Sequence, residues 1–416
     1  MMMVLMINKK CFITKEDLVN KLLMPDIANV KLATAAAGIK YQNRNDVLLI
    51  NIDGSANVAG VFTKSLCPSA PVEHCRNILS KGRITALVVN SGNANAFTGS
   101  RGRISVKNTV EAIAEALGCA KEEVYVASTG VIGEPLDENR IIAKIPELKS
   151  RLKTSSWADA AKAIMTTDLF AKSSSLSFIL DGQEIVINAI AKGAGMIAPN
   201  MATMLGFIGT NAAIESSLLQ KILQRAVDKS FNIITVDSDT STSDSVILFA
   251  TGKENYITDE SDPRAKIFQE KLDEVLLSLA LQIVSDGEGA THLVNISVTG
   301  AVSDDSARVI ARTIADSPLV KTAVAGNDAN WGRVVMAVGK AGEPADRDKL
   351  AIYFGEYCVA INGAISEFYD ESALSEYMKN YQIDIKVDLS IGNGCAEIWT
   401  CDLTKEYVAI NADYRS

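Results

Sequence analysis

Histidine is almost absent from this chain of 416 residues, which contains only His74 and His292. Two imidazoles exclude a histidine-rich metal centre and leave at most two candidates for a histidine general base. If the protein is an enzyme, we therefore expect its proton transfers to use a group other than imidazole, and we expect no metal or other cofactor.

Cysteine is also sparse, and its pattern excludes a disulfide framework or a zinc site. The seven cysteines are odd in number, scattered and never spaced as C-x-x-C. Reduced thiols in a cytoplasmic protein explain this pattern better than disulfides or a zinc site.

An excess of basic charge is missing as well, because the chain has 41 basic and 50 acidic side chains and a net charge of −9. This balance argues against a nucleic-acid partner.

Long hydrophobic runs are lacking too. No window approaches the roughly 18 uninterrupted apolar residues of a membrane span. The apolar start at 1–7 is too short for a signal-peptide core and is followed, not preceded, by Lys9 and Lys10. With 48 % hydrophobic and 22 % charged residues, the composition is that of a soluble globular protein. We expect a cytoplasmic location and no membrane partner.

What the sequence does contain is a mixture of strand and helix patterns. Short β-branched or apolar runs bounded by turn residues predict strands at 47–51, 85–90, 124–127, 245–250, 294–298 and 383–389. Apolar residues at three- and four-residue steps predict helices at 106–117, 218–227 and 265–284. Strands and helices do not alternate strictly, which favours a mixed α/β fold. A glycine-rich turn after the third helix predicts two domains, 1–290 and 291–416.

Glycine and small polar residues gather in several loops, and each loop alone has a structural explanation in turns and helix caps. The segment 192–205 is unusual because Thr203 stands in it between Ala202 and Met204. A threonine hydroxyl is a weak nucleophile without a base in hydrogen-bond reach. If the Ala202–Thr203 bond were cut, the α-amine of Thr203, with a pKa of about 7.7–8.0, could supply that base. The residues alone leave a purely structural role for this loop as the alternative interpretation.

The segment 192–205, KGAGMIAPNMATML, resembles the signature of the ornithine acetyltransferase family of arginine biosynthesis, also called the bifunctional glutamate/ornithine N-acetyltransferases. Further motifs in the same order carry the resemblance along nearly the whole chain, apart from about residues 1–30. They are 36–40, 60–63, 90–99, 128–133, 165–168, 235–244, 286–291, 326–333 and 411–416.

The resemblance implies a self-processing sandwich fold with an N-terminal threonine nucleophile and a smaller C-terminal α/β domain. Cleavage between Ala202 and Thr203 would give chains 1–202 and 203–416, which stay associated and assemble as a heterotetramer or larger. Thr203 would carry the acetyl group from N-acetylornithine to glutamate, releasing ornithine. The family's oxyanion pair matches Thr129 and Gly130. Its substrate-binding positions match Thr166 (with Thr167 as the adjacent alternative), Lys192, Thr203, Glu288, Asn411 and Ser416.

Departures from the family pattern leave the nucleophile and the oxyanion pair untouched. Ser416 replaces the common terminal threonine, Ser238 and Ser243 replace glycine and asparagine, and His292 replaces lysine. Acetyl-CoA could serve as a co-substrate, and no residue indicates whether it does. Two alternatives remain: an N-terminal-nucleophile amidase or aminopeptidase, which would pass the acyl group to water, and a non-catalytic metabolite-binding protein.

Overall fold

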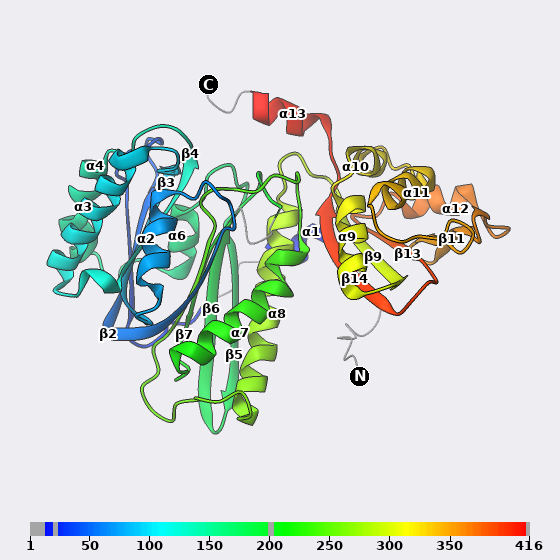
Figure 1. Cartoon of the computed structure of the whole chain (residues 1–416). Helices are drawn as coiled ribbons and strands as arrows, with labels where there is room; N and C mark the ends of the chain where they lie inside the picture. Colours follow the sequence, from blue (N-terminus) through cyan, green and yellow to red (C-terminus); the bar gives the residue numbers. More distant parts are fainter. Residues whose placement is uncertain (1–12, 20–23, 199–203, 413–416) are drawn as a thin grey trace. The chain divides into compact units, whose positions relative to one another are not determined.

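The computed structural model describes residues 13–19, 24–198 and 204–412, which form two compact units (Figure 1). One unit comprises 24–288; the other comprises 289–412 together with 13–19. Both contain strands and helices, so the predicted mixed α/β class is confirmed. The domain division at residue 290 stays a prediction, because compactness alone does not establish that the parts fold independently.

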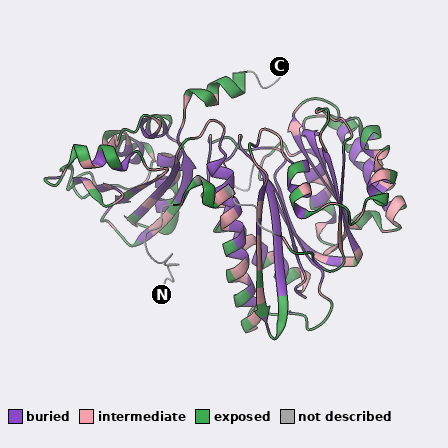
Figure 2. Cartoon of the chain, turned by 180° about the vertical axis from the view of Figure 1, so that it is seen from behind, coloured by how far each residue is buried: buried purple, intermediate pink, exposed green. Residues whose placement is uncertain are grey.

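The unit 24–288 is built on an eight-stranded sheet in the order β4-β3-β2-β8-β7-β6-β5, with β1 also paired to β2. Its described strands are β1 (Val30–Ala35), β2 (Val47–Phe62), β3 (Arg83–Asn93), β4 (Val124–Val131), β5 (Lys172–Leu180), β6 (Gln183–Lys192), β7 (Leu205–Thr210) and β8 (Ser245–Ala250). Figure 2 shows these strands as largely buried.

Strand β2 joins the two halves of this sheet. Its first part pairs with β1 and β3, and its last six residues pair with β8. The change of partners follows an irregularity at Gly54 and Ser55, whose φ angles are 74° and 63°. A left-handed backbone inside a strand bends it. Residues of both halves, among them Val88 of β3 and Phe207 of β7, belong to one hydrophobic core.

Helices cover this sheet. Helices α2 and α3 pack against β4, α7 packs against β2, and α8 lies along β5 and β6 (Figure 1). The described helices of this unit are α2 (Ala70–Leu79), α3 (Gly99–Leu117), α4 (Glu138–Ile142), α5 (Ile145–Ser150), α6 (Trp157–Ala163), α7 (Ser216–Asp228) and α8 (Pro263–Ser285), with short 3-10 turns at Lys121–Glu123 and Phe231–Ile233.

The unit 289–412 contains a six-stranded sheet in the order β12-β11-β10-β13-β9-β14, in which β9 and β13 run parallel. Its strands are β9 (Leu293–Ala301), β10 (Ala351–Phe354), β11 (Tyr357–Ile361), β12 (Ala364–Ile365), β13 (Gln382–Asp388) and β14 (Gly394–Cys401). Its helices are α1 (Lys15–Val19), α9 (Asp304–Ala315), α10 (Pro318–Ala325), α11 (Trp331–Lys340), α12 (Glu371–Tyr377) and α13 (Lys405–Ala412).

The strands and helices predicted from the sequence all fall on observed elements of the two units, so these predictions are confirmed. Among the described residues, no helix combines the length and apolarity needed to cross a membrane.

The packing of α6 on the sheet gives a stability prediction. The Trp157 and Phe249 rings stack with centroids 6.4 Å apart, and Phe249 is fully buried. We expect Phe249→Ala to lower the free energy of unfolding of this unit by about 3–5 kcal/mol, because it opens a cavity in the core. Chemical denaturation measures the change. Phe97, which is 86 % exposed, provides the matched control, since Phe97→Ala should change stability by no more than about 0.5 kcal/mol. Equal effects of the two substitutions would contradict this account.

Candidate functional site

The carboxyl ends of β3 and β4 place Thr129 and Gly130 against the neighbouring backbone. The two strands are parallel, so Ser91 pairs with Thr129 and Gly92 with Gly130. Gly130 has a φ of +132°, and a Cβ there would lie 2.3 Å from the carbonyl carbon of Gly92. Only glycine fits this close approach.

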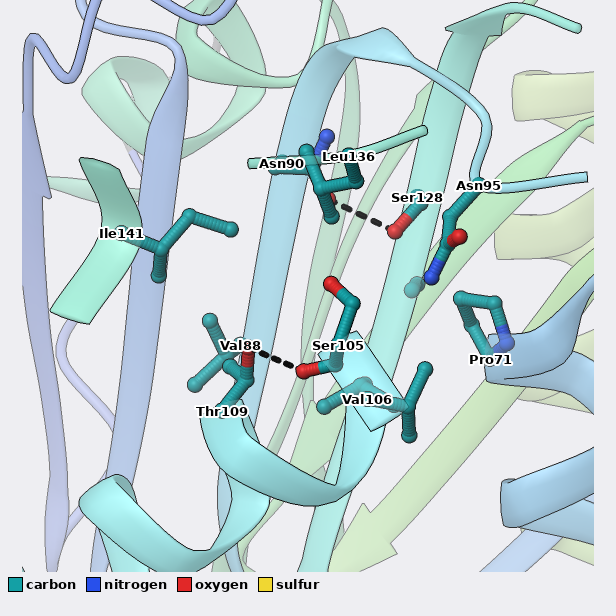
Figure 3. A pocket seen from close by; sticks show the side chains of 12 residues that line it. Pro71, Val88, Asn90, Asn95, Ser105, Val106, Thr109, Ser128, Leu136 and Ile141 are labelled. Carbon is teal, nitrogen blue, oxygen red and sulfur yellow. Dashed lines mark hydrogen bonds between the residues drawn. The ribbon is translucent and has the colours of Figure 1, made fainter. Parts of the chain in front are cut away.

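A small cavity lies beneath this segment (Figure 3). Its volume of about 10 Å³ is roughly that needed by a single water molecule. Beside it, the Ser128 hydroxyl donates to the Asn90 amide oxygen at 2.6 Å, which connects β4 to β3. The buried Ser105 hydroxyl, also on the cavity wall, has no hydrogen-bond partner within the described residues. The polar wall of the cavity thus supports the chain just before Thr129.

Strand β6 ends at Lys192, whose ammonium group reaches Thr129. The Lys192 Nζ atom donates to Thr129 Oγ1 at 3.1 Å, and both residues are only 7 % exposed. Since the hydroxyl oxygen already accepts a bond from a cation, its own proton is left to donate to another acceptor. The Lys192 charge also makes Thr129 a stronger donor, because hydrogen bonds in a chain polarise one another. Thr129 thus keeps a hydroxyl proton beside a positively charged group, which is what a donor to a developing oxyanion requires.

The edge of the sheet that carries Lys192 is also the edge at which β7 begins. Lys192 pairs with Leu205 across the antiparallel β6–β7 ladder, and Leu205 pairs with Ser245 of the parallel strand β8. Thr203 precedes Leu205 by two positions in the sequence. The predicted cleavage residues Ala202 and Thr203 lie outside the described residues, and so does Ser416.

Glu288 lies against the glycine turn that follows β6. Its N–H donates to the Ala194 carbonyl oxygen at 3.0 Å, and a Cβ on Gly195 would lie 2.5 Å from the Glu288 carboxyl carbon. A side chain at position 195 would therefore displace the Glu288 carboxylate from this place. This contact places an acidic side chain beside the Lys192–Gly195 turn.

Thr166 is brought to the same turn through Asp168. One Asp168 oxygen accepts the N–H of Thr166 at 2.8 Å, and the other accepts the N–H of Gly193 at 2.7 Å. Thr167, the adjacent alternative, is half-buried as Thr166 is. The unit 24–288 thus gathers Thr129, Gly130, Thr166, Lys192 and Glu288 around the end of β6.

Asn411 belongs to the other unit, on helix α13. Its side-chain amide donates to the Tyr407 carbonyl oxygen one turn earlier, at 3.0 Å. Figure 2 shows α13 exposed along its length.

The two histidines are hydrogen-bonded in separate units. A His74 ring nitrogen bonds to the Val124 carbonyl oxygen at 3.0 Å, and burial lowers the pKa of His74. The His292 ring lies 3.1 Å from Asp402 Oδ2. Within the described ranges, no group of three or more His, Cys, Asp or Glu side chains is arranged to hold a metal ion.

Sequence reasoning missed the buried charges around Lys192. Lys172 forms ion pairs of 2.6 Å with both Asp168 and Asp286, and all three side chains are at most 1 % exposed. The Asp244 carboxyl is also buried, and burial raises its pKa well above its usual range, although Lys192 opposes this shift. One signal was present in the sequence: Asp168 stands four residues before Lys172, the first residue of β5. Nothing in that spacing indicated full burial.

The close approach at Gly130 gives a prediction with a built-in control. Gly130→Ala should lower the free energy of unfolding by more than about 2 kcal/mol, because the new methyl group would force β3 and β4 apart. Gly133 also has a positive φ, 86°, but no atom lies within 4 Å of its Cβ position. Gly133→Ala should therefore cost only the backbone strain of about 1 kcal/mol. Denaturant unfolding measures both, and similar losses would show that the contact with Gly92 is unimportant.

Comparisons with known proteins extend these observations. Residues 31–416 match the ArgJ family. The arginine biosynthesis bifunctional protein ArgJ of Bartonella henselae is 56 % identical over 395 residues, which cover 94 % of this chain and 96 % of the relative. The corresponding protein of Brucella melitensis is 57 % identical over 398 residues, with the same coverage.

Solved structures of similar proteins include the arginine biosynthesis bifunctional protein ArgJ of Bacillus halodurans, which is 39 % identical. The match covers 50 % of this chain and 99 % of that one, with a TM-score of 0.49. The ornithine acetyltransferase of Mycobacterium tuberculosis complexed with ornithine is 34 % identical, with 42 % and 93 % coverage and a TM-score of 0.38. The family match and the curated relatives span nearly the whole chain, and they carry the conclusion: this chain belongs to the ArgJ family.

Proposed function

We propose that this chain is a self-processing acetyltransferase of arginine biosynthesis. It moves the acetyl group of N2-acetyl-L-ornithine to L-glutamate through an acetyl-threonine intermediate. The observation that carries the proposal is the buried Lys192–Thr129 hydrogen bond beside Glu288. ArgJ relatives of 56–57 % identity, named for arginine biosynthesis, support the same activity.

Acyl transfer needs donors aimed at the oxygen that becomes negative in the tetrahedral intermediate. Thr129, polarised by Lys192, and the backbone N–H of Gly130 are the proposed donors. They come from a strand end that the Gly92 contact fixes. Such preorganised donors stabilise the transition state without reorganising during the reaction.

Charges at the same turn suit an amino-acid substrate. Lys192 is a point charge for a substrate carboxylate, and Glu288 is an acceptor for the amino group of ornithine. Thr166, Asn411 and Ser416 are the proposed remaining contacts, with Thr167 as the alternative to Thr166. A substrate with both a carboxylate and an amine would match both charged groups.

Thr203 is the proposed nucleophile, and self-cleavage would prepare it. Its hydroxyl would attack the Ala202 carbonyl, and breakage of the Ala202 C–N bond would leave an ester and free the α-amine as a base. Hydrolysis of the ester would then restore the Thr203 hydroxyl and separate the two chains. In the transfer reaction, Thr203 would accept acetyl from N-acetylornithine, ornithine would leave, and the glutamate amine would attack the acetyl-threonine. This sequence is a ping-pong reaction.

The sheet order explains why two chains, 1–202 and 203–416, would stay together. Strands β7 and β8 belong to the second chain, and they lie between β2 and β6 of the first. Both ladders, β2–β8 and β6–β7, would thus join the two chains. The pair is proposed to assemble further into a heterotetramer or larger.

Acetyl transfer by the purified protein tests the proposed function. With N-acetylornithine as donor, we expect N-acetylglutamate to form and the kinetics to be ping-pong. Supplying acetyl-CoA in place of N-acetylornithine determines whether acetyl-CoA is a second donor. Mass spectrometry identifies the products. Release of free acetate without glutamate acetylation would favour the amidase alternative instead.

Self-cleavage gives a second prediction. The purified wild type should give two bands of nearly equal size on a denaturing gel. Thr203→Ala should give one band and no acetyl transfer, because neither the nucleophile nor the new α-amine would exist. Thr203→Ser, which keeps a hydroxyl, is the matched control and should retain some cleavage. Cleavage after Ala202 in Thr203→Ala would contradict the mechanism, and an intact wild-type chain would favour a non-catalytic binding protein.

A further inference from the structure

We propose that Asp168, Lys172 and Asp286 are positioning residues for Lys192. In this cluster, an ionised Asp168 keeps the buried Lys192 ammonium charged and fixes the turn that follows Lys192. This inference rests on the proposed function, in which Lys192 supports Thr129 and holds a substrate carboxylate. Nothing in the sequence resemblance assigned a role to these three residues.

The three residues form a closed cluster of buried charges. Lys172 Nζ lies 2.6 Å from Asp168 Oδ1 and 2.6 Å from Asp286 Oδ2, and the side chains are 0 % or 1 % exposed. Removing three charged groups from water is energetically unfavourable unless opposite charges and hydrogen bonds compensate each of them. Two carboxylates around one ammonium leave a net negative charge when all three are ionised. The Lys192 ammonium supplies the balancing positive charge.

Backbone hydrogen bonds connect the cluster to two segments of the site, the turn after β6 and the 166–169 turn. Asp168 Oδ1 accepts the N–H of Gly193 at 2.7 Å, directly after Lys192. Asp168 Oδ2 accepts the N–H of Thr166, and Asp286 Oδ2 accepts the N–H of Leu169 at 3.0 Å. The two segments carry or adjoin the proposed substrate contacts Lys192 and Thr166, and Asp286 itself stands two residues before Glu288. The cluster therefore fixes the positions of these proposed substrate contacts relative to one another.

The charged groups that act on Lys192 come from all the elements around it. Burial lowers the pKa of Lys192, Asp168 opposes this most strongly, and Lys172 acts as a like charge. Asp244 and Glu288 also favour the charged ammonium.

Asp168 is the carboxylate suited to this role near neutral pH. Burial alone would raise its pKa, but Lys172 and Lys192 hold that pKa well below its usual range. Burial raises the pKa of Asp244 well above its usual range, which weakens Asp244 as a counter-charge. An ionised Asp168 therefore accounts for a charged lysine in a buried position.

The pH dependence of acetyl transfer tests the inference. Loss of the Asp168 charge should lower the pKa of Lys192, so the ammonium would deprotonate at lower pH. In Asp168→Asn, we expect the alkaline limb of kcat/KM for N-acetylornithine to move down by about one pH unit or more. A folded, active Asp168→Asn enzyme with an unmoved alkaline limb would overturn the inference.

Asp273 provides a matched control on helix α8. It is 8 % exposed and pairs with Lys229 at 2.7 Å, but it is not among the charges that act on Lys192. Asp273→Asn should reduce thermal stability and leave the alkaline limb where it is in the wild type. An equal shift in both variants would mean that general destabilisation moves the limb, and would also overturn the inference.

A binding measurement on the wild type keeps the test independent of whether Asp168→Asn folds. Ornithine binding is followed by calorimetry at pH 7 in two buffers of different ionisation enthalpy. A charged Lys192 predicts almost no proton uptake, whereas uptake of about one proton would show a neutral Lys192 and overturn the inference. Ornithine binding without any acetyl transfer would count against the proposed function, while the proton count would still report whether Lys192 is charged.

Discussion

The cost of burying the Lys192 ammonium constrains the whole site. A charge removed from water must be compensated by hydrogen bonds and opposite charges, or it is lost by deprotonation. The ends of β4, β6 and β8, the 166–169 turn and the end of α8 supply groups around this one cation. The turn that follows Lys192 lies against two carboxylates, since Asp168 accepts the N–H of Gly193 and the Glu288 carboxyl lies beside Gly195. The arrangement of strand ends and the local electrostatics thus have one physical origin.

The elements that the sequence predicted are those whose patterns are strong. Helix α8 has apolar residues at regular three- and four-residue steps, and β8 is an almost wholly apolar run that contains two β-branched residues and a phenylalanine. Strand β7 was missed because Gly206 and Gly209 lower strand propensity. The structure explains Gly209, since a Cβ there would lie 2.7 Å from the Phe249 ring. A central strand that needs glycine for packing does not show the usual pattern of a strand.

For the candidate site, sequence motifs identified residues but could not show how they are arranged. Thr129, Lys192 and Glu288 are far apart in the sequence, and the resemblance alone linked them before the fold was known. Lys172 could not have been identified in this way, because a lysine near the start of a serine-rich strand usually faces solvent. Its burial depends on Asp286, which is 114 residues away. Long-range charge compensation of this kind is a property of the folded chain and not of a local pattern.

The position of β7 and β8 between β2 and β6 has a consequence for how the enzyme matures. Neither chain of the proposed processed pair could complete the sheet by itself, because each would lack the strands that its central ladders need. If the chain is cut as proposed, it must be made and folded in one piece beforehand. Only a molecule whose sheet has closed would then bring the proposed catalytic groups together, so misfolded copies would remain uncut and inactive.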